Sequence, residues 1–368
     1  MTVTAPRLCL VGPLPPPSGG MANQCEQLLR LWRQEGLAVT LVRNNAPYAP
    51  AWIGRVPVLR AGFRLLPYLW QLWTAAGRSD VMHVLANSGW AWHLFAWPAV
   101  VIARLRGCAV IVNYRGGHAD QFFSHGPRHV LRTLASAQLR VTPSAFLLRV
   151  FGEHGLDAEV IPNIIDLTRF APAPRRDPGD APHLIVTRNL EPIYDIGTAL
   201  RAFAIVRRTL RNATLTVAGS GPDLAALRRQ AASLGIAGAV RFSGRIDNAQ
   251  IGALYASADC VLNPSTVDNM PISILEAFAS GVPTVSTDAG GIPDLLTHGV
   301  DGLLVPIGDA EAMANAALNV LQDAALAERL RQAGLHTAQR YAWPRVREQW
   351  LDAYRRAAGL RGRERVVA

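Results

Sequence analysis

Short runs of aliphatic and β-branched residues alternate along the chain with longer segments whose apolar positions recur at helical spacing. This alternation is typical of parallel α/β units, in which each strand is followed by a helix that covers the sheet. In the first half it predicts strands at 8–11, 38–42, 81–84, 109–113 and 139–141, with helices such as 21–34 and 90–104. In the second half it predicts strands at 184–187, 214–218, 240–243, 260–263 and 284–286, with helices near 196–210, 222–234, 248–256 and 271–280.

Because the pattern occurs twice, the sequence predicts two Rossmann-like, doubly wound parallel-sheet domains. The expected domains are 1–170 and 183–342, joined by a linker at 171–182 that is dense in proline and charge. An amphipathic helix from 343 to 368 is long enough to pack back on the first domain. Ligands of such sheets bind beyond the carboxyl ends of the strands, so we expect the two domains to face each other across a substrate cleft.

Composition agrees with two buried cores, because 50% of the 368 residues are apolar and only 17% are charged. No apolar run reaches the roughly 18 residues of a membrane-spanning helix, and the start of the chain has no signal-peptide pattern. We therefore expect a cytoplasmic protein. The four cysteines and nine histidines show no metal-ligand spacing, which predicts buried free thiols and no bound metal.

The net charge of +10 is concentrated in the first half of the chain. Residues 36–79 hold five arginines and no acid, interleaved with Trp52, Phe63, Tyr68, Trp70 and Trp73. Such a stretch suits peripheral contact with the cytoplasmic face of an anionic membrane. It is equally typical of a solvated helix face with core aromatics. No motif for binding nucleic acid accompanies the charge, so we expect no nucleic-acid partner.

Two segments can bind a phosphorylated ligand. Gly19 and Gly20 lie between the first strand and the first helix, where paired glycines let backbone approach an anion; a tight proline-rich turn is the alternative. In the second segment, Pro271 is expected as the first helical residue. Asp268 then lies just ahead of the helix and Glu276 inside it, so two carboxylates and a helix N-terminus converge. A capped amphipathic helix is the alternative there.

Four segments resemble the family-4 retaining glycosyltransferases (glycosyl transferases group 1). Asp268 and Glu276 have the family's spacing of an acid, seven residues and a glutamate, within a segment that continues to 293. Residues 161–166, 218–222 and 298–305 resemble other family segments in the right order. The resemblance implies the GT-B fold, with two Rossmann-like domains. It also implies transfer of a sugar from a nucleotide diphosphate sugar, linked to UDP or GDP, to a glycan or lipid-linked acceptor, with retention and without a metal or other cofactor.

The resemblance also implies roles for single residues. Glu276 would accept hydrogen bonds from the ribose, and Asp268 would hold hydroxyls of the transferred sugar. The other donor-binding positions are the backbone of Asn269 and Met270, the helix N-terminus at Pro271, Ile272 and Ser273, and the turn at Gly19 and Gly20.

The chain departs from the family at two places. The first acid is aspartate in place of the usual glutamate. Asn189 and Tyr194 stand where an arginine and a lysine are expected to neutralise the diphosphate, so Arg188 is the best substitute cation. For the first-domain histidine of the family, His118 is the first candidate and His125 the second.

Arg115 stands near that histidine position and is a candidate for a phosphate or sugar contact. Two other functions remain open at this point: a sugar-nucleotide epimerase on the same scaffold, and a non-catalytic nucleotide-sugar binder.

Overall fold

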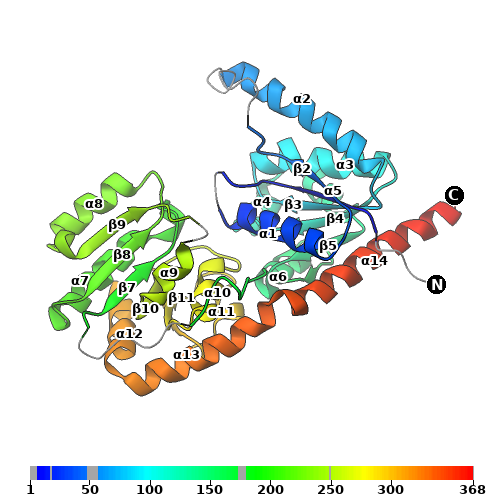
Figure 1. Ribbon diagram of the computed structural model, residues 1–368. Coiled ribbons are helices and arrows are strands. Elements are labelled where there is room, and N and C mark those ends of the chain that lie inside the picture. The colour runs from blue at the N-terminus through cyan, green and yellow to red at the C-terminus, as the bar shows by residue number, and fades with distance from the viewer. Residues whose placement is uncertain (1–5, 17–18, 48–56, 173–179, 248–249, 368) are drawn as a thin grey trace. The chain divides into compact units, whose positions relative to one another are not determined.

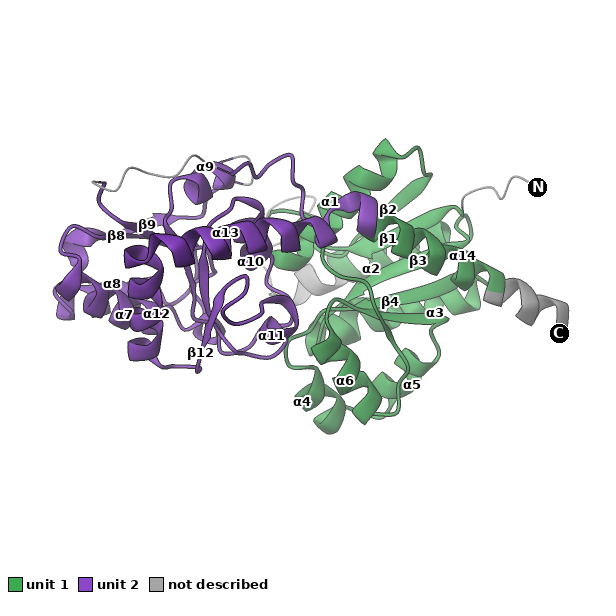
Figure 2. Cartoon of the chain, turned by 90° about the horizontal axis from the view of Figure 1, so that it is seen from below, with its two compact units in different colours: residues 1–164, 346–368 green, residues 165–345 purple. Residues whose placement is uncertain are grey.

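The computed structural model describes residues 6–16, 19–47, 57–172, 180–247 and 250–367, of which 57–62 and 360–367 are described by their backbone alone. The chain forms two compact units (Figures 1 and 2). Unit 1 consists of residues 1–164 and 346–368, and unit 2 consists of residues 165–345. All four cysteines are free and buried.

Unit 1 is built on a parallel sheet of six strands in the order β2-β1-β3-β4-β5-β6. β2 lies on one side of β1, and β3 to β6 follow on the other side. The switch point of this sheet therefore lies between β1 and β3. β1, β3 and β4 are buried at every position, which explains their continuous apolar runs. The strands are β1 (Leu8–Gly12), β2 (Val39–Arg43), β3 (Val81–Ala86), β4 (Ala109–Tyr114), β5 (Leu139–Thr142) and β6 (Glu159–Val160).

Helices cover both faces of this sheet. On one face, α2, α3, α5 and α6 form a core with alternate strand residues such as Cys9, Val84 and Val112. On the other face, α1 and the C-terminal helix α14 meet through the rings of Trp32 and Tyr354, whose centroids are 5.5 Å apart. The helices are α1 (Gly20–Gln34), α2 (Pro57–Ala76), α3 (Trp97–Leu105), α4 (Ala119–His125), α5 (His129–Ala135), α6 (Ala145–Glu153) and α14 (Trp343–Val367).

Unit 2 has a second parallel sheet of six strands in the order β12-β11-β10-β7-β8-β9. Read from β9, this is the doubly wound order of dinucleotide-binding folds, with its switch point between β7 and β10. The strands are β7 (His183–Val186), β8 (Thr214–Ala218), β9 (Val240–Gly244), β10 (Cys260–Asn263), β11 (Thr284–Thr287) and β12 (Leu303–Val305).

The helices of unit 2 form two apolar clusters, one on each face of the sheet. The first contains α7 and α12 together with α8, and the second contains α9, α10 and α11. Helix α13 packs against α10 and α12. The helices are α7 (Ile196–Thr209), α8 (Leu224–Ser233), α9 (Ile251–Ala256), α10 (Ile272–Ala279), α11 (Ile292–Leu295), α12 (Ala310–Gln322) and α13 (Ala324–Ala338).

Apart from small shifts at the ends of elements, the structure differs from the prediction in one domain boundary and in the course of one helix. Ile165 and Phe170, expected in the first domain, are buried in the α9–α10 cluster, so unit 2 begins at Ile165. The helix predicted at 90–104 is interrupted by a π-helical turn, η2 (Trp92–Ala96), before α3 begins. Pro98 has no N–H to donate to the preceding turn, which accounts for the change of hydrogen-bond pattern there.

No helix in the part of the chain that the structure describes is long and apolar enough to cross a membrane.

Candidate functional site

The candidate site in unit 2 lies at the switch point of its sheet. Arg188 follows the carboxyl end of β7, and Asp268 belongs to the loop between β10 and α10. These two strands are neighbours in the sheet, so the two loops meet at the edge where ligands of doubly wound sheets bind.

Arg188 is the centre of this group of side chains. Its guanidinium forms an ion pair with Asp268 and donates a second hydrogen bond to Ser273 Oγ at 3.2 Å. The guanidinium carbon also lies 4.1 Å from the centroid of the Tyr194 ring. The Arg188 side chain is only 11% exposed. Three neighbours therefore fix a positive charge next to the first turn of α10.

Two glycine turns hold the loops that carry this ion pair. A Cβ on Gly219 would lie 2.0 Å from the carbonyl oxygen of Arg188, and one on Gly291 would lie 2.0 Å from that of Asn269. Gly291 N–H also donates to Asp268 O at 2.8 Å. Because only glycine permits this approach of backbone to backbone, both turns act as supports for the site.

The N-terminus of α10 begins one residue later than predicted. Pro271 is the N-cap, with φ −66° and ψ 120°, and the first helical residue is Ile272. The extended ψ of Pro271 lets the preceding loop turn away from the helix. Asn269 and Met270 are buried in that loop, and Ser273 is buried in the first helical turn. Ile274 N–H donates to Pro271 O at 3.2 Å, whereas the N–H groups of Ile272 and Ser273 have no acceptor one turn earlier in the helix and can bind an anion.

Glu276 lies farther along α10 and contacts Tyr255 of α9. The Tyr255 hydroxyl lies 3.0 Å from Glu276 Oε2, 2.7 Å from Thr187 Oγ1 and 3.1 Å from Ser273 O. Burial raises the pKa of Glu276 to about 7, although the Tyr255 hydrogen bond and the charges of Arg169 and Arg188 lower it. Glu276 and Asp268 are therefore linked through Ser273, whose carbonyl contacts Tyr255 and whose hydroxyl contacts Arg188.

In unit 1, α1 is the first element after β1, and Gly19 and Gly20 lie at its start. Gly19 is the N-cap with an extended backbone, and Gly20 is the first helical residue. A Cβ on Gly19 would meet nothing within 4 Å. Among the described residues, neither backbone conformation nor packing requires glycine at this N-cap.

Arg115 follows the carboxyl end of β4 and belongs to a buried polar chain in unit 1. It donates to Asn163 Oδ1 and, at 3.5 Å, to Asn113 Oδ1. Asn113 Nδ2 lies 3.1 Å from His83 Nε2, and His83 Nδ1 lies 2.8 Å from the Tyr354 hydroxyl. Because the amide donates to Nε2, the His83 proton belongs on Nδ1. Burial lowers the pKa of Arg115 to about 10 and that of His83 to about 3.

The two candidate histidines differ in their surroundings. His118 is exposed at the N-cap of α4 and makes no capping hydrogen bond through its side chain. His125 is exposed at the end of the same helix, where its Nδ1 lies 3.1 Å from Gln121 O. His125 thus stabilises the last turn of its own helix, and His118 is left as the histidine nearer to Arg115 in the loop after β4.

The sequence did not predict the contacts of three side chains that support these groups. Tyr255 and His83 lie inside a helix and a strand whose patterns indicate ordinary core positions, so nothing in the sequence marks their polar partners. From the sequence, Tyr194 stands out only because it occupies the position where the family resemblance implies a lysine. Its stacking on Arg188 depends on the turn η3 (Pro192–Tyr194), which the structure alone reveals.

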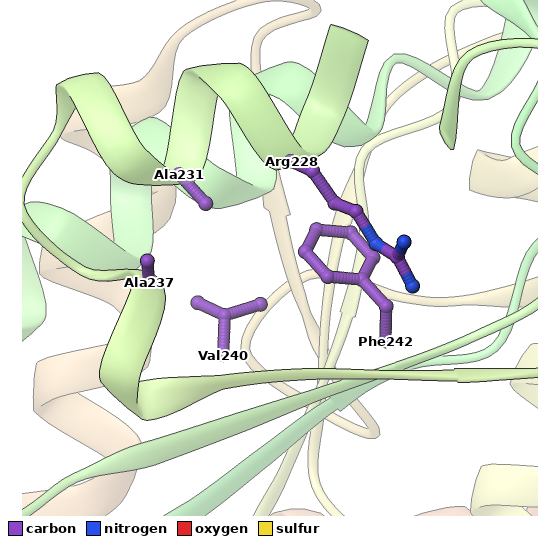
Figure 3. A pocket seen from close by; sticks show the side chains of 5 residues that line it. All are labelled: Arg228, Ala231, Ala237, Val240 and Phe242. Carbon is purple, nitrogen blue, oxygen red and sulfur yellow. The ribbon is translucent and has the colours of Figure 1, made fainter. Parts of the chain in front are cut away.

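A hollow on the surface of unit 2 lies apart from these residues. It is lined by Arg228, Ala231, Ala237, Val240 and Phe242, between α8 and β9 (Figure 3). β9 is the edge strand, separated from β7 by β8, and none of the predicted site residues belongs to it. Among the described residues, no three His, Cys, Asp or Glu side chains are grouped so that they could hold a metal ion.

Known proteins that are similar to this chain in sequence or in fold include several glycosyltransferases. Residues 169–337 match the model of the family described as glycosyl transferases group 1. A GDP-mannose-dependent alpha-(1-6)-phosphatidylinositol monomannoside mannosyltransferase of Mycolicibacterium smegmatis is 29% identical, over 96% of this chain and 97% of the relative. A glycogen synthase of Mycobacterium tuberculosis is 28% identical over 75% of this chain and 67% of its own length.

Among solved structures, Anabaena Alr3699/HepE in complex with UDP is similar with a TM-score of 0.72 at 18% identity, over 94% of this chain and 99% of that chain. Sucrose-phosphate synthase from Thermosynechococcus elongatus has a TM-score of 0.74 at 17% identity, over 95% of this chain and 98% of that chain. The two parallel sheets of this protein have the fold of these two proteins, which confirms the predicted fold class.

Proposed function

From the match of residues 169–337 to the model of the glycosyl transferases group 1 family, we propose that this chain is a retaining, metal-independent glycosyltransferase, which transfers a sugar from a nucleotide diphosphate sugar. The observation that carries the proposal is the placement of Arg188 between Asp268, Ser273 and Tyr194 at the switch point of unit 2. A fixed, poorly hydrated cation beside a helix N-terminus suits the negative charge that develops on a departing diphosphate.

Each donor contact follows from the chemistry of one group. Arg188 and the N–H groups of Ile272 and Ser273 bind the diphosphate. Glu276, when ionised, accepts hydrogen bonds from the ribose hydroxyls. Asp268 accepts hydrogen bonds from the transferred sugar and shares its charge with Arg188. Carboxylates suit hydroxyl donors, and the guanidinium suits phosphate oxygens.

In the proposed step, the bond between the anomeric carbon and the β-phosphate oxygen breaks first, with an oxocarbenium-like transition state. The acceptor oxygen forms its bond to the same face of the anomeric carbon. Its proton passes to the departing phosphate oxygen. The donor and the acceptor together supply every atom, electron pair and proton of this step. Arg188 lowers the barrier by stabilising the diphosphate as its charge grows.

The relatives that match along the whole chain suggest the substrates. Two such relatives, from Mycolicibacterium smegmatis and Mycobacterium tuberculosis, are named as GDP-mannose-dependent enzymes acting on a mannosylated phosphatidylinositol. We therefore take a GDP-linked sugar as the first donor to test and a lipid-linked sugar as the first acceptor. A lipid-linked acceptor is embedded in a membrane, so an enzyme that uses it benefits from peripheral contact with the cytoplasmic face of that membrane, here through residues 36–79. The parts of Gly19, Gly20, Arg115 and His118 in the reaction stay predictions.

A thermal-shift titration with GDP, UDP, ADP and CMP, without added metal, tests donor binding. A ligand that binds only the folded protein raises its stability according to ligand concentration and Kd. We expect one diphosphate to raise the melting temperature and the effect to disappear in Glu276→Ala. If no nucleotide shifts the transition, the site does not hold a donor, and the proposed transfer fails.

A separate product assay addresses the two other functions. Incubation with the sugar donor in the absence of any acceptor, followed by analysis of the sugar, detects an epimerase through a changed donor. Nucleotide binding without turnover on mannosylated lipid, polysaccharide or free sugar acceptors indicates a non-catalytic binder. Sugar appearing on an acceptor, with release of the nucleoside diphosphate, is the result that the proposal expects.

A further inference from the structure

The outer side of the α2–α3 layer in unit 1 carries an unusual number of exposed apolar side chains. Of the ten large hydrophobic side chains exposed in the described part of the chain, eight lie between Phe63 and Leu105. The other two, Val300 and Ile307, belong to unit 2. Isolated exposed hydrophobics are normal, whereas a group of them on one face indicates a surface that another partner covers.

Helix α2 shows why packing within unit 1 does not use these side chains. Its Tyr68, Leu72 and Ala75 are buried against the core. Phe63, Leu66, Trp70 and Trp73 recur at helical spacing on the other side, with Leu66 at 70% and Trp70 at 69% exposed. A helix that is apolar on both sides is expected only where its outer side also avoids water.

The neighbouring helix extends this surface. α2 and α3 are in contact, and the Tyr68 hydroxyl of α2 donates to Phe95 O of η2 at 2.7 Å. Trp90, Leu94, Trp97 and Leu105 are exposed along the segment from the turn before η2 to the end of α3, with Trp90 at 78% and Leu105 at 72%. These residues lie outside 36–79, so the sequence had indicated only one part of the surface.

The part of the chain that contains this surface is mainly basic. From residue 36 to residue 152 the chain has twelve arginines and only two acids, Asp80 and Asp120. Asp80 pairs with Arg7, and Asp120 pairs with His154. Arg106 is exposed beside the apolar side chains, with its guanidinium carbon 4.7 Å from the Trp73 ring centroid. Arginine next to exposed tryptophan is the combination found at the interface of an anionic bilayer.

We propose that the outer side of α2, η2 and α3 is a docking surface for an anionic phospholipid membrane. Trp70, Leu66 and Trp90 insert into the headgroup region, and arginines such as Arg106 contact lipid phosphates. The surface lies on the membrane without crossing it. This inference extends the proposed transfer to a lipid-linked acceptor, because it would bring unit 1 to the place where such an acceptor is embedded.

Flotation of the full chain with vesicles tests the docking surface. We expect binding to vesicles of phosphatidylcholine with phosphatidylglycerol, weaker binding to phosphatidylcholine alone, and loss of most binding in about 0.5 M salt. Leu66→Gln with Trp70→Gln should lower the vesicle affinity by at least about tenfold. Trp90→Gln should lower it as well, and Arg106→Gln by about fivefold.

The matched control is Val300→Gln with Ile307→Gln, which removes two exposed apolar side chains from unit 2. This variant should bind vesicles like the wild type. The proposal is overturned if the wild type does not bind anionic vesicles, or if the variants in the two units behave alike. It is also overturned if Leu66→Gln with Trp70→Gln only converts a dimer to a monomer in light scattering, since the surface would then serve a second copy of the chain.

The nucleotide thermal shift separates this proposal from the proposed transfer. If GDP or UDP raises the melting temperature but the protein does not bind vesicles, the docking surface is refuted and the proposed transfer stands. Vesicle binding that depends on Leu66 and Trp70, without any nucleotide shift, supports the docking surface and removes the proposed transfer.

Discussion

Glu276 makes nucleotide binding sensitive to pH. Burial raises its pKa to about 7 from the ordinary 4.5 of a glutamate, although the Tyr255 hydrogen bond and the charges of Arg169 and Arg188 oppose the increase. At neutral pH the carboxyl group is therefore about half ionised. Only the carboxylate form can accept hydrogen bonds from two ribose hydroxyls at once, so the nucleotide should bind mainly to the ionised protein.

The size of the effect follows from the titration of one group. Between about pH 8 and pH 6 the ionised fraction falls from roughly nine tenths to one tenth, so the Kd for GDP or UDP should rise about tenfold. Glu276→Gln should bind more weakly, and its Kd should lack this additional pH dependence. Because the folded pKa is raised, the stability linked to Glu276 is fully present below about pH 4.5 and is lost as pH rises through about 7.

Isothermal titration at several pH values, with wild type and Glu276→Gln in the same buffers, is the measurement. The terminal phosphate of the nucleotide also titrates near neutrality, and the Gln variant supplies that background. A wild-type Kd whose pH dependence equals that of the variant would refute the reasoning. It would mean that Glu276 does not change its ionisation when the nucleotide binds.

Three further predictions concern single side chains. Arg188→Met should weaken GDP binding by roughly 10- to 100-fold, while GMP binding changes little, because charge-assisted bonds to the second phosphate are lost; equal losses for both nucleotides in calorimetry would contradict this. Tyr194→Phe keeps an aromatic ring against Arg188 and should bind GDP like the wild type, whereas Tyr194→Leu should bind roughly three- to tenfold more weakly in the same assay. Burial lowers the pKa of His83 to about 3, so its contribution to stability is present above about pH 6.5 and is lost as pH falls toward 3; nitrogen NMR should find the ring neutral at about pH 5 with its proton on Nδ1, and a protonated ring would contradict the buried chain.

The sequence predicted the architecture because hydrophobic periodicity is a local property. β8 and β10 begin and end where the pattern places them, at Thr214–Ala218 and Cys260–Asn263. β6 has only two residues and leaves too short a pattern to recognise. The boundary at Ile165 depends on which core Ile165 and Phe170 enter, and that contact links distant parts of the chain.

The candidate site was predicted residue by residue, but its connections were not. Spacing placed Asp268 ahead of a helix and Glu276 inside it. Nothing in the sequence indicated that Arg188 pairs with Asp268 while its guanidinium lies over Tyr194. Such contacts depend on the turns at Gly219 and Gly291, which set the position of the backbone from distant strands. The exposed side of α2 was equally hidden, because an apolar helix in a sequence does not show which of its sides the core leaves uncovered.

The central claim is that the chain transfers a sugar with retention from a nucleotide diphosphate sugar. The most direct test is proton NMR of the product formed from GDP-α-mannose and a mannosylated phosphatidylinositol in vesicles, without added metal. We predict an α-linked mannose on the acceptor, together with released GDP, and neither in Glu276→Ala. A β-linked product, an epimerised donor or an unchanged mixture with the wild-type enzyme would contradict the account.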